Sequence, residues 1–159
     1  MVTDFAKRLE CKRNIQSYIS QLSHLSNREV KAADLLSLEA TNVIREQAKL
    51  LPNKPFQKFK IKFSEKLDER FAMFVKNLYS LNSTPIYIWL KHTNTCGLFE
   101  IRSIMEFNFN FDYSVVNEGI ISLLTKDLND NIILDFFEDS GEKFIEIELR
   151  GKNWSTCVY

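Results

Sequence analysis

Residues 131–150, NIILDFFEDSGEKFIEIELR, constrain the fold more than any other part of this chain. Apolar residues alternate with polar ones on both sides of an Asp-Ser-Gly triplet, which is typical of two strands joined by a turn. Successive side chains of a strand face opposite ways, so the aliphatic residues of the second run would share one face, and an acidic set would occupy the other. The aliphatic residues are Ile145, Ile147 and Leu149, and the opposite set is Glu142, Phe144, Glu146 and Glu148.

The length and composition indicate one folded domain. The chain has 159 residues, of which 45% are hydrophobic and 26% charged, and these values are ordinary for a globular protein. Four glycines and three prolines leave little room for long linkers. We therefore expect residues 1–159 to form a single domain, with a mainly helical part over 1–84 and an antiparallel sheet part over 85–159.

Charge is distributed unevenly along the chain although the formal net charge is zero. Residues 1–76 hold 15 Lys and Arg against 9 Asp and Glu, whereas residues 77–159 hold 6 against 12. Such asymmetry can create an interaction surface, or the two halves can pair within the fold. Internal pairing is the favoured interpretation, because helices and sheet must pack together in any case.

Three helices are predicted in the first half by the spacing of apolar residues, over 4–22, 28–51 and 65–80. The second is the best signalled, because Ser26 and Glu29 have the spacing of a capping box and Pro52 would stop the helix. Ser64 could cap the third helix. Between the second and third helices, FQKFKIKF over 56–63 alternates lysine with apolar residues, which predicts a short half-exposed strand, suited to a sheet edge.

Strands are predicted after Pro85, over 86–91, 98–111, 119–126, 131–137 and 143–150. Their short links favour an antiparallel meander over parallel crossover units. The expected fold class is α+β, with about three N-terminal helices packed on a C-terminal antiparallel meander sheet of five to six strands. One sheet face would be covered by helices and the other would be at least partly wet.

Cysteine usage and the absence of apolar runs indicate a cytoplasmic protein. Cys11, Cys96 and Cys157 are odd in number and widely spaced, which argues against a disulfide framework and suits free thiols in a reducing compartment. The N-terminus lacks the apolar stretch of a secretory signal, and no run approaches the roughly 18 apolar residues of a membrane span. No membrane partner is expected, and the sequence does not specify an oligomeric state.

The chain contains no recognisable catalytic or metal-binding motif. No phosphate-binding, dinucleotide-binding or hydrolase motif occurs, and His92 with Cys96 supplies fewer ligands than a zinc site needs. Residues 127–138 match the ligand offsets of a calcium loop, but Ile132 stands where that loop requires glycine, so a hairpin turn is favoured. We expect no catalytic residues, no metal and no cofactor. An unrecognised enzyme would need a concave pocket holding groups with perturbed pKa values.

A nucleic-acid-binding accessory protein is the alternative function, through the basic 54–70 segment. Its lysines lie beside Phe56 and Phe59, and such mixing of cations with rings is typical of single-strand binders. The sequence pI of 6.7 speaks against this, because nucleic-acid-binding domains are usually markedly basic. The competing interpretation is a solvated edge strand guarded by lysine. The lysines are Lys54, Lys58, Lys60, Lys62 and Lys66.

The acidic face of the hairpin is the candidate partner-binding surface. Rings among carboxylates could anchor in a basic groove of another protein, while the carboxylates stand in for nucleic-acid phosphates. The competing interpretation is a solvated acidic face, with both rings covered by another segment. The candidate residues are Asp135, Phe137, Glu138, Asp139, Glu142, Phe144, Glu146 and Glu148.

The acidic C-terminal segment GIISLLTKDLNDNIILDFFEDSGEKFIEIELRGKNW, behind a helical N-terminal half, resembles small immunity proteins. These cytoplasmic proteins are encoded beside bacterial contact-dependent or polymorphic toxins. The resemblance implies a non-catalytic inhibitor that binds a cognate toxin domain, often a nuclease, and blocks its active site or a nearby surface. The expected partner is therefore a toxin domain.

Overall fold

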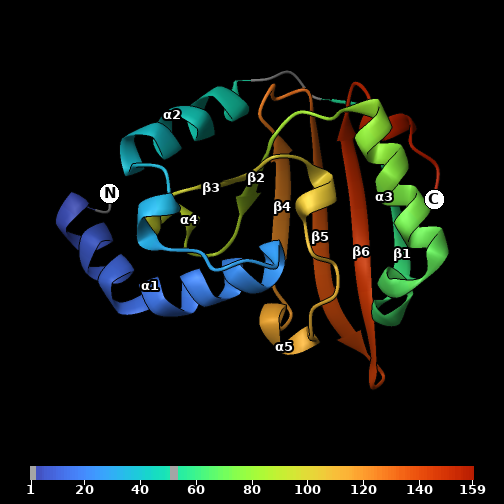
Figure 1. The fold of residues 1–159 in the computed structure, drawn as a ribbon, viewed down its shortest axis with the longest axis horizontal. Coiled ribbons are helices and arrows are strands. Elements are labelled where there is room, and N and C mark those ends of the chain that lie inside the picture. The colour runs from blue at the N-terminus through green and yellow to red at the C-terminus, as the bar shows by residue number, and fades with distance from the viewer. Residues whose placement is uncertain (1–2, 51–53) are drawn as a thin grey trace.

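A six-stranded antiparallel sheet organises the protein, as seen in a computed structural model that describes residues 3–50 and 54–159. The strand order across the sheet is β1-β6-β5-β4-β2-β3 (Figure 1). The strands are β1 (Phe56–Lys62), β2 (Ile86–Trp89), β3 (Phe99–Ile101), β4 (Ile120–Thr125), β5 (Asp130–Asp139) and β6 (Glu142–Gly151). The helices are α1 (Asp4–Ser26), α2 (Leu38–Lys49), α3 (Glu69–Leu81), α4 (Thr93–Cys96) and α5 (Tyr113–Val116).

Short 3₁₀ turns complete the element order. They are η1 (Ala32–Asp34), η2 (Phe63–Leu67), η3 (Ile104–Glu106) and η4 (Trp154–Thr156). The α+β class is thereby confirmed, as is an antiparallel sheet of six strands.

The predicted hairpin is confirmed, and its two strands are β5 and β6. Asp139 pairs with Glu142, so only Ser140 and Gly141 lie in the turn. Both have positive φ, 53° and 81°, as a two-residue turn that matches the twist of the strands requires. The aliphatic side chains of β6 are buried as expected, and the hairpin projects beyond the neighbouring strands (Figure 1).

The inner face of the sheet is covered by α1, α3 and α5 (Figure 1). Phe71 and Phe74 of α3 are 1% exposed, and Phe74 lies edge-on to Phe59 of β1 at 5.6 Å between ring centroids. Burying a side chain of this size contributes about 1.5–3 kcal/mol of transfer free energy. The core therefore lies between this helical layer and the sheet.

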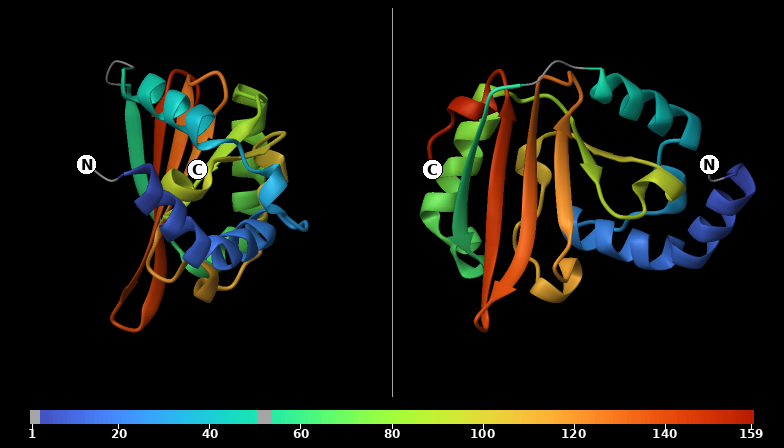
Figure 2. Two further views of the ribbon diagram at one scale, coloured as in Figure 1. Left: turned by 90° about the vertical axis from the view of Figure 1, so that its left-hand side faces the viewer. Right: turned by 180° about the vertical axis from the view of Figure 1, so that it is seen from behind.

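The outer face is covered only in part. Helix α2 packs on one corner, where Ile44 and Ala48 contact Tyr87 and Leu124. Over β1, β6 and β5 no helix of the described residues lies on this face (Figure 2, right). The expectation of one covered and one partly wet face is confirmed, because the helical half of the chain supplies too little apolar surface for both sides.

The predicted helix over 28–51 is wrong in its first ten residues. Helix α1 continues to Ser26, and Asn27 ends it in a left-handed conformation with φ 51°. The next regular helix, α2, starts only at Leu38, after Ser37 caps it by accepting a hydrogen bond from Ala40 N. Leu36 N instead donates to Leu98 O at 2.8 Å, a tertiary contact that the helical pattern could not reveal. The predicted stop at Pro52 lies outside the described residues.

The predicted third helix begins later than its pattern indicated, because Phe63–Leu67 form a 3₁₀ turn and α3 starts at Glu69. Asp68, rather than Ser64, occupies the N-cap position.

The predicted strand over 98–111 is also wrong beyond Ile101. Ser103 accepts a hydrogen bond from Met105 N at 3.2 Å and begins a 3₁₀ turn, which takes the chain out of the sheet. The alternating phenylalanines that follow belong to an irregular segment, in which Phe107 and Phe111 are buried against the inner face. The sheet is also not a simple meander, because β1 from the first half of the chain pairs with β6.

Candidate partner-binding surface

The lysines of β1 neutralise the acids of β6. In the antiparallel register Lys58 is opposite Glu148 and Lys60 is opposite Glu146. Lys58 Nζ lies 3.1 Å from Glu146 Oε1 and 3.9 Å from Glu148 Oε2. The uneven charge of the chain is therefore offset internally along these two strands, in agreement with the favoured interpretation.

Three of the eight residues predicted to bind a partner form ion pairs within the protein. Glu146 and Glu148 pair with Lys58, and Glu142 Oε1 lies 2.9 Å from Lys62 Nζ. Each of these pairs is at the surface, where water and salt screen the attraction, so each contributes little to stability. Arg150 Nε also pairs with Glu148 Oε1, so three cations offset these three acids and weaken their long-range attraction for a basic partner.

The basic 54–70 segment does not present its lysines as one solvated stripe. Lys66 is only 5% exposed, and its ammonium group lies 4.3 Å from the centroid of the Phe63 ring. Burial lowers the pKa of Lys66. Lys54 donates to the carbonyl oxygen of Leu128, while Lys58 and Lys62 are in ion pairs. The continuous cationic track of a single-strand binder is absent from these described lysines.

Two rings of the hairpin remain on the outer face. Phe137 and Phe144 are opposite each other in the register and stack with centroids 5.6 Å apart. Lys60 Nζ lies 4.7 Å above the Phe144 ring. Both rings are half-buried, chiefly by these neighbours, because no described helix covers this part of the sheet (Figure 2, right). Partly wet rings of this kind gain free energy when a partner covers them.

Four carboxylates near this end of the sheet form no ion pair among the described residues, and two of them share the outer face with the rings. Asp135, Glu138 and Asp139 form no ion pair with any described cation, and neither does Glu118, which sequence reasoning missed. Burial raises the pKa of the Tyr113 hydroxyl, and the charges of Glu118, Glu138 and Asp135 raise it further. Asp135 and Asp139 share the face of Phe137, because strand residues alternate. Glu138 points to the opposite face, where its register partner Lys143 lies over the Tyr113 ring, and Glu118 lines the cleft beside α1.

We define the hairpin surface as the rings, the two unpaired acids that share their face and one exposed aliphatic residue beside them. Ile120 is opposite Asp135 in the register and is 59% exposed. The alternation of β4 could have identified Ile120, because it falls on the outward side of that strand. The hairpin surface consists of the residues that share this face, which are Ile120, Asp135, Phe137, Asp139 and Phe144, so the predicted Glu138 lies outside it.

A cleft of about 790 Å³ lies between α1, α5 and the start of β4. Both histidines line it, His24 from α1 and His92 after β2, together with Lys91 and Glu118. Among residues 3–50 and 54–159 no group of three His, Cys, Asp or Glu residues is arranged to hold a metal ion. The cleft thus offers hydrogen-bonding groups, without a set of side chains that defines a reaction.

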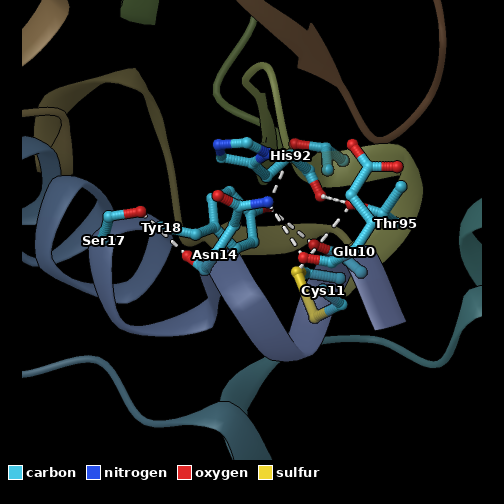
Figure 3. The surroundings of a disulfide bond; sticks show 10 residues. Glu10, Cys11, Asn14, Ser17, Tyr18, His92 and Thr95 are labelled. Carbon is cyan, nitrogen blue, oxygen red and sulfur yellow. Dashed lines mark hydrogen bonds between the residues drawn. A yellow bond between two sulfur atoms is a disulfide. The ribbon is translucent and has the colours of Figure 1, made fainter. Parts of the chain in front are cut away.

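The expectation of three free thiols is wrong. Cys11 of α1 and Cys96 of α4 form a disulfide, with their Cα atoms 5.1 Å apart (Figure 3). Residues so distant in sequence give no signal of this contact until the helices are placed. Cys96 is therefore not available as a nucleophile beside His92 in this state. Cys157 is free, and burial raises the pKa of its thiol.

Asp130 is a buried carboxylate whose role the sequence did not reveal. It is fully buried and accepts hydrogen bonds from the backbone nitrogens of Asn153 and Trp154, at 2.7 and 2.8 Å. The side-chain amides of Asn82 and Asn153 also donate to it, at 2.7 and 2.8 Å. Because ionised carboxylates are costly to bury without such donors, Asp130 has a structural role in holding the C-terminal segment.

Comparison with known proteins gives no relative: no family model, no curated sequence and no solved structure matches this chain. Over the part of the chain that the structure describes, every helix is too short or too polar to cross a bilayer.

Proposed function

We propose that this protein is a non-catalytic inhibitor, an immunity protein that binds a cognate bacterial toxin domain through the hairpin surface. The observation that carries this proposal is the stacked pair Phe137 and Phe144 on an uncovered sheet face that also carries Asp135 and Asp139, two carboxylates without an ion pair to a described cation. The class of partner, a toxin, rests on the resemblance of the acidic C-terminal half to immunity proteins.

The chemistry of the hairpin surface favours a basic partner. Asp135 and Asp139 form no ion pair with a described cation, and Lys143 points to the opposite face, where its ammonium lies 4.9 Å over the Tyr113 ring. The surface thus keeps a negative charge. Long-range attraction of a positive groove would raise the association rate, and the two rings would then anchor the complex. A nuclease active-site groove has this character, because it must bind phosphates.

Cytoplasmic action has a consequence for the disulfide. Cytoplasmic thiols are kept reduced, so a cytoplasmic inhibitor would act with Cys11 and Cys96 as thiols. We therefore expect a double Cys11→Ser, Cys96→Ser variant to neutralise the toxin as well as the wild-type protein does.

Rescue of growth by co-expression with a candidate toxin domain tests the proposal. Phe137→Ala with Phe144→Ala should abolish rescue and capture of the toxin, and Asp135→Lys should slow association most at low salt. Glu29→Lys, an exposed residue away from the hairpin, is the charge-matched control. Full rescue by the double alanine variant would rule out the hairpin surface. Salt-sensitive binding of single-stranded DNA, lost when Lys58, Lys60 and Lys62 are replaced, would instead support the nucleic-acid alternative.

A further inference from the structure

A groove of about 280 Å³ lies where α2 stops covering the outer face. Arg45 and Lys49 of α2 form its wall, and Trp89, Ser122 and Asn131 line its floor from β2, β4 and β5. Trp89 is opposite Ser122, and Ser122 is opposite Ile133, so the groove continues directly onto the uncovered part of the sheet. It thus opens on the face that carries the hairpin surface.

The groove holds more hydrogen-bond donors than its own acceptors satisfy. Arg45 Nε is buried without a hydrogen bond among the described residues, and Glu46 Oε1 lies 3.4 Å away. Lys49 Nζ lies 3.3 Å from the same carboxylate oxygen. Two cations therefore share one acid, and the wall has a net charge of about +1.

The floor adds neutral polar groups to this wall. Ser122 and Asn131 contribute a hydroxyl and an amide to the floor, and both groups can donate to an acceptor. Trp89 is half-buried and offers an indole against which a planar group can lie. An acceptor with a single negative charge and a flat shape complements this set best.

We propose that the groove binds one carboxylate, carried on a side chain of the protein that covers the outer face; this rests on the proposed function. A monoanion matches the single surplus positive charge, whereas a phosphate dianion would leave charge unbalanced. The volume lies just under the roughly 300–1,000 Å³ typical of small-molecule sites, so it suits one side chain rather than a cofactor. The partner would thus present a basic groove to the hairpin and an acidic residue to α2.

The test is a titration of the full chain with benzoate, followed through the indole N–H signals in NMR spectra. Only two tryptophans are present, and Trp154 is fully buried with Nε1 donating to Leu78 O at 3.0 Å, so its signal is an internal control. Benzoate should shift the Trp89 signal with a dissociation constant of about 10 mM, and the position of the Trp154 signal should not change. Benzamide and inorganic phosphate should bind at least about fivefold more weakly, because they lack the matching charge.

Arg45→Gln and Lys49→Gln should each weaken benzoate binding about fivefold or more, whereas Lys76→Gln on α3 should not. Arg45→Gln should also weaken binding of the toxin captured in the rescue experiment. Equal shifts with benzamide or phosphate, no shift of Trp89, or unchanged toxin affinity of the Arg45 variant would overturn the proposal. Those results can occur while Phe137→Ala with Phe144→Ala still abolishes capture, in which case the proposed function stands and only the groove is rejected.

Discussion

Lys58 and Glu146 form an ion pair of 3.1 Å between the edge strand β1 and its neighbour β6. Each residue is a candidate for contact with another molecule on sequence grounds, one as part of a basic segment and the other as part of an acidic face. Because they meet across adjacent strands, much of the charge on both is satisfied within the protein.

A double-mutant cycle should measure this pairing. With Lys58→Ala, Glu146→Ala and the double variant, urea unfolding should give a coupling free energy of about 0.2–1 kcal/mol, decreasing with salt because the side chains are partly exposed. Glu146→Lys should destabilise the protein further, since it places three lysines together on two strands. Asp139→Lys is the control without an ion pair. Zero coupling at low salt would show that the Lys58–Glu146 ion pair does not help to hold β1 against β6.

Replacing Asp130 should strongly destabilise the C-terminal segment. The amide of Asp130→Asn has one acceptor oxygen in place of two, so either the backbone donors of Asn153 and Trp154 or the side-chain amides of Asn82 and Asn153 face its NH2 group and lose their acceptor. We expect a loss of about 3 kcal/mol in the free energy of unfolding. The fluorescence of buried Trp154 should shift to the red in the same urea titration. Asp139→Asn, at the exposed hairpin tip, should change stability by less than about 0.5 kcal/mol.

Tyr18 should make stability fall at high pH. Burial raises its pKa to about 12, with a smaller opposing effect of the hydrogen bond to Thr93. A tyrosine in the unfolded chain ionises near pH 10, so the folded state is favoured fully below about pH 10 and loses this advantage as pH rises toward 12. The contribution lost is about 3 kcal/mol. Urea unfolding at pH 7, 10 and 11 should show a smaller pH dependence for Tyr18→Phe, while Tyr79→Phe, an exposed residue, should behave as wild type.

Reduction of the Cys11–Cys96 disulfide should free the first half of α1. The buried residues of this helix, Tyr18, Leu22, Leu25 and Ser26, all lie in its second half, whereas Phe5 is 75% exposed. The bond spans 85 residues, and its removal should lower the free energy of unfolding by at most about 4.6 kcal/mol. Hydrogen exchange should accelerate over residues 4–14 on reduction and remain slow over 18–26. Equally accelerated hydrogen exchange along the whole helix would contradict the view that the disulfide holds only the first half of α1 in place.

Period-two alternation and turn chemistry are sufficient to predict the hairpin. Ser140 and Gly141 tolerate the left-handed backbone of a two-residue turn, and the aliphatic residues of β6 specify which face is buried. The same reasoning fails over 98–111, because an alternating row of phenylalanines can also line an irregular segment that packs its rings into the core. Periodicity indicates which side chains are buried, but it does not indicate which groups the backbone hydrogen-bonds to.

Local sequence thus determined the α+β class, the antiparallel hairpin and the division into buried and wet faces, since each follows from neighbouring side chains and their hydrophobicity. Tertiary structure alone decided that Lys58 would neutralise Glu146 and that Cys11 would meet Cys96, because these contacts join residues 88 and 85 positions apart. It also decided which acids were left without an ion pair around Phe137 and Phe144. Long-range charge pairing depends on strand order, and strand order depends on how the whole core packs.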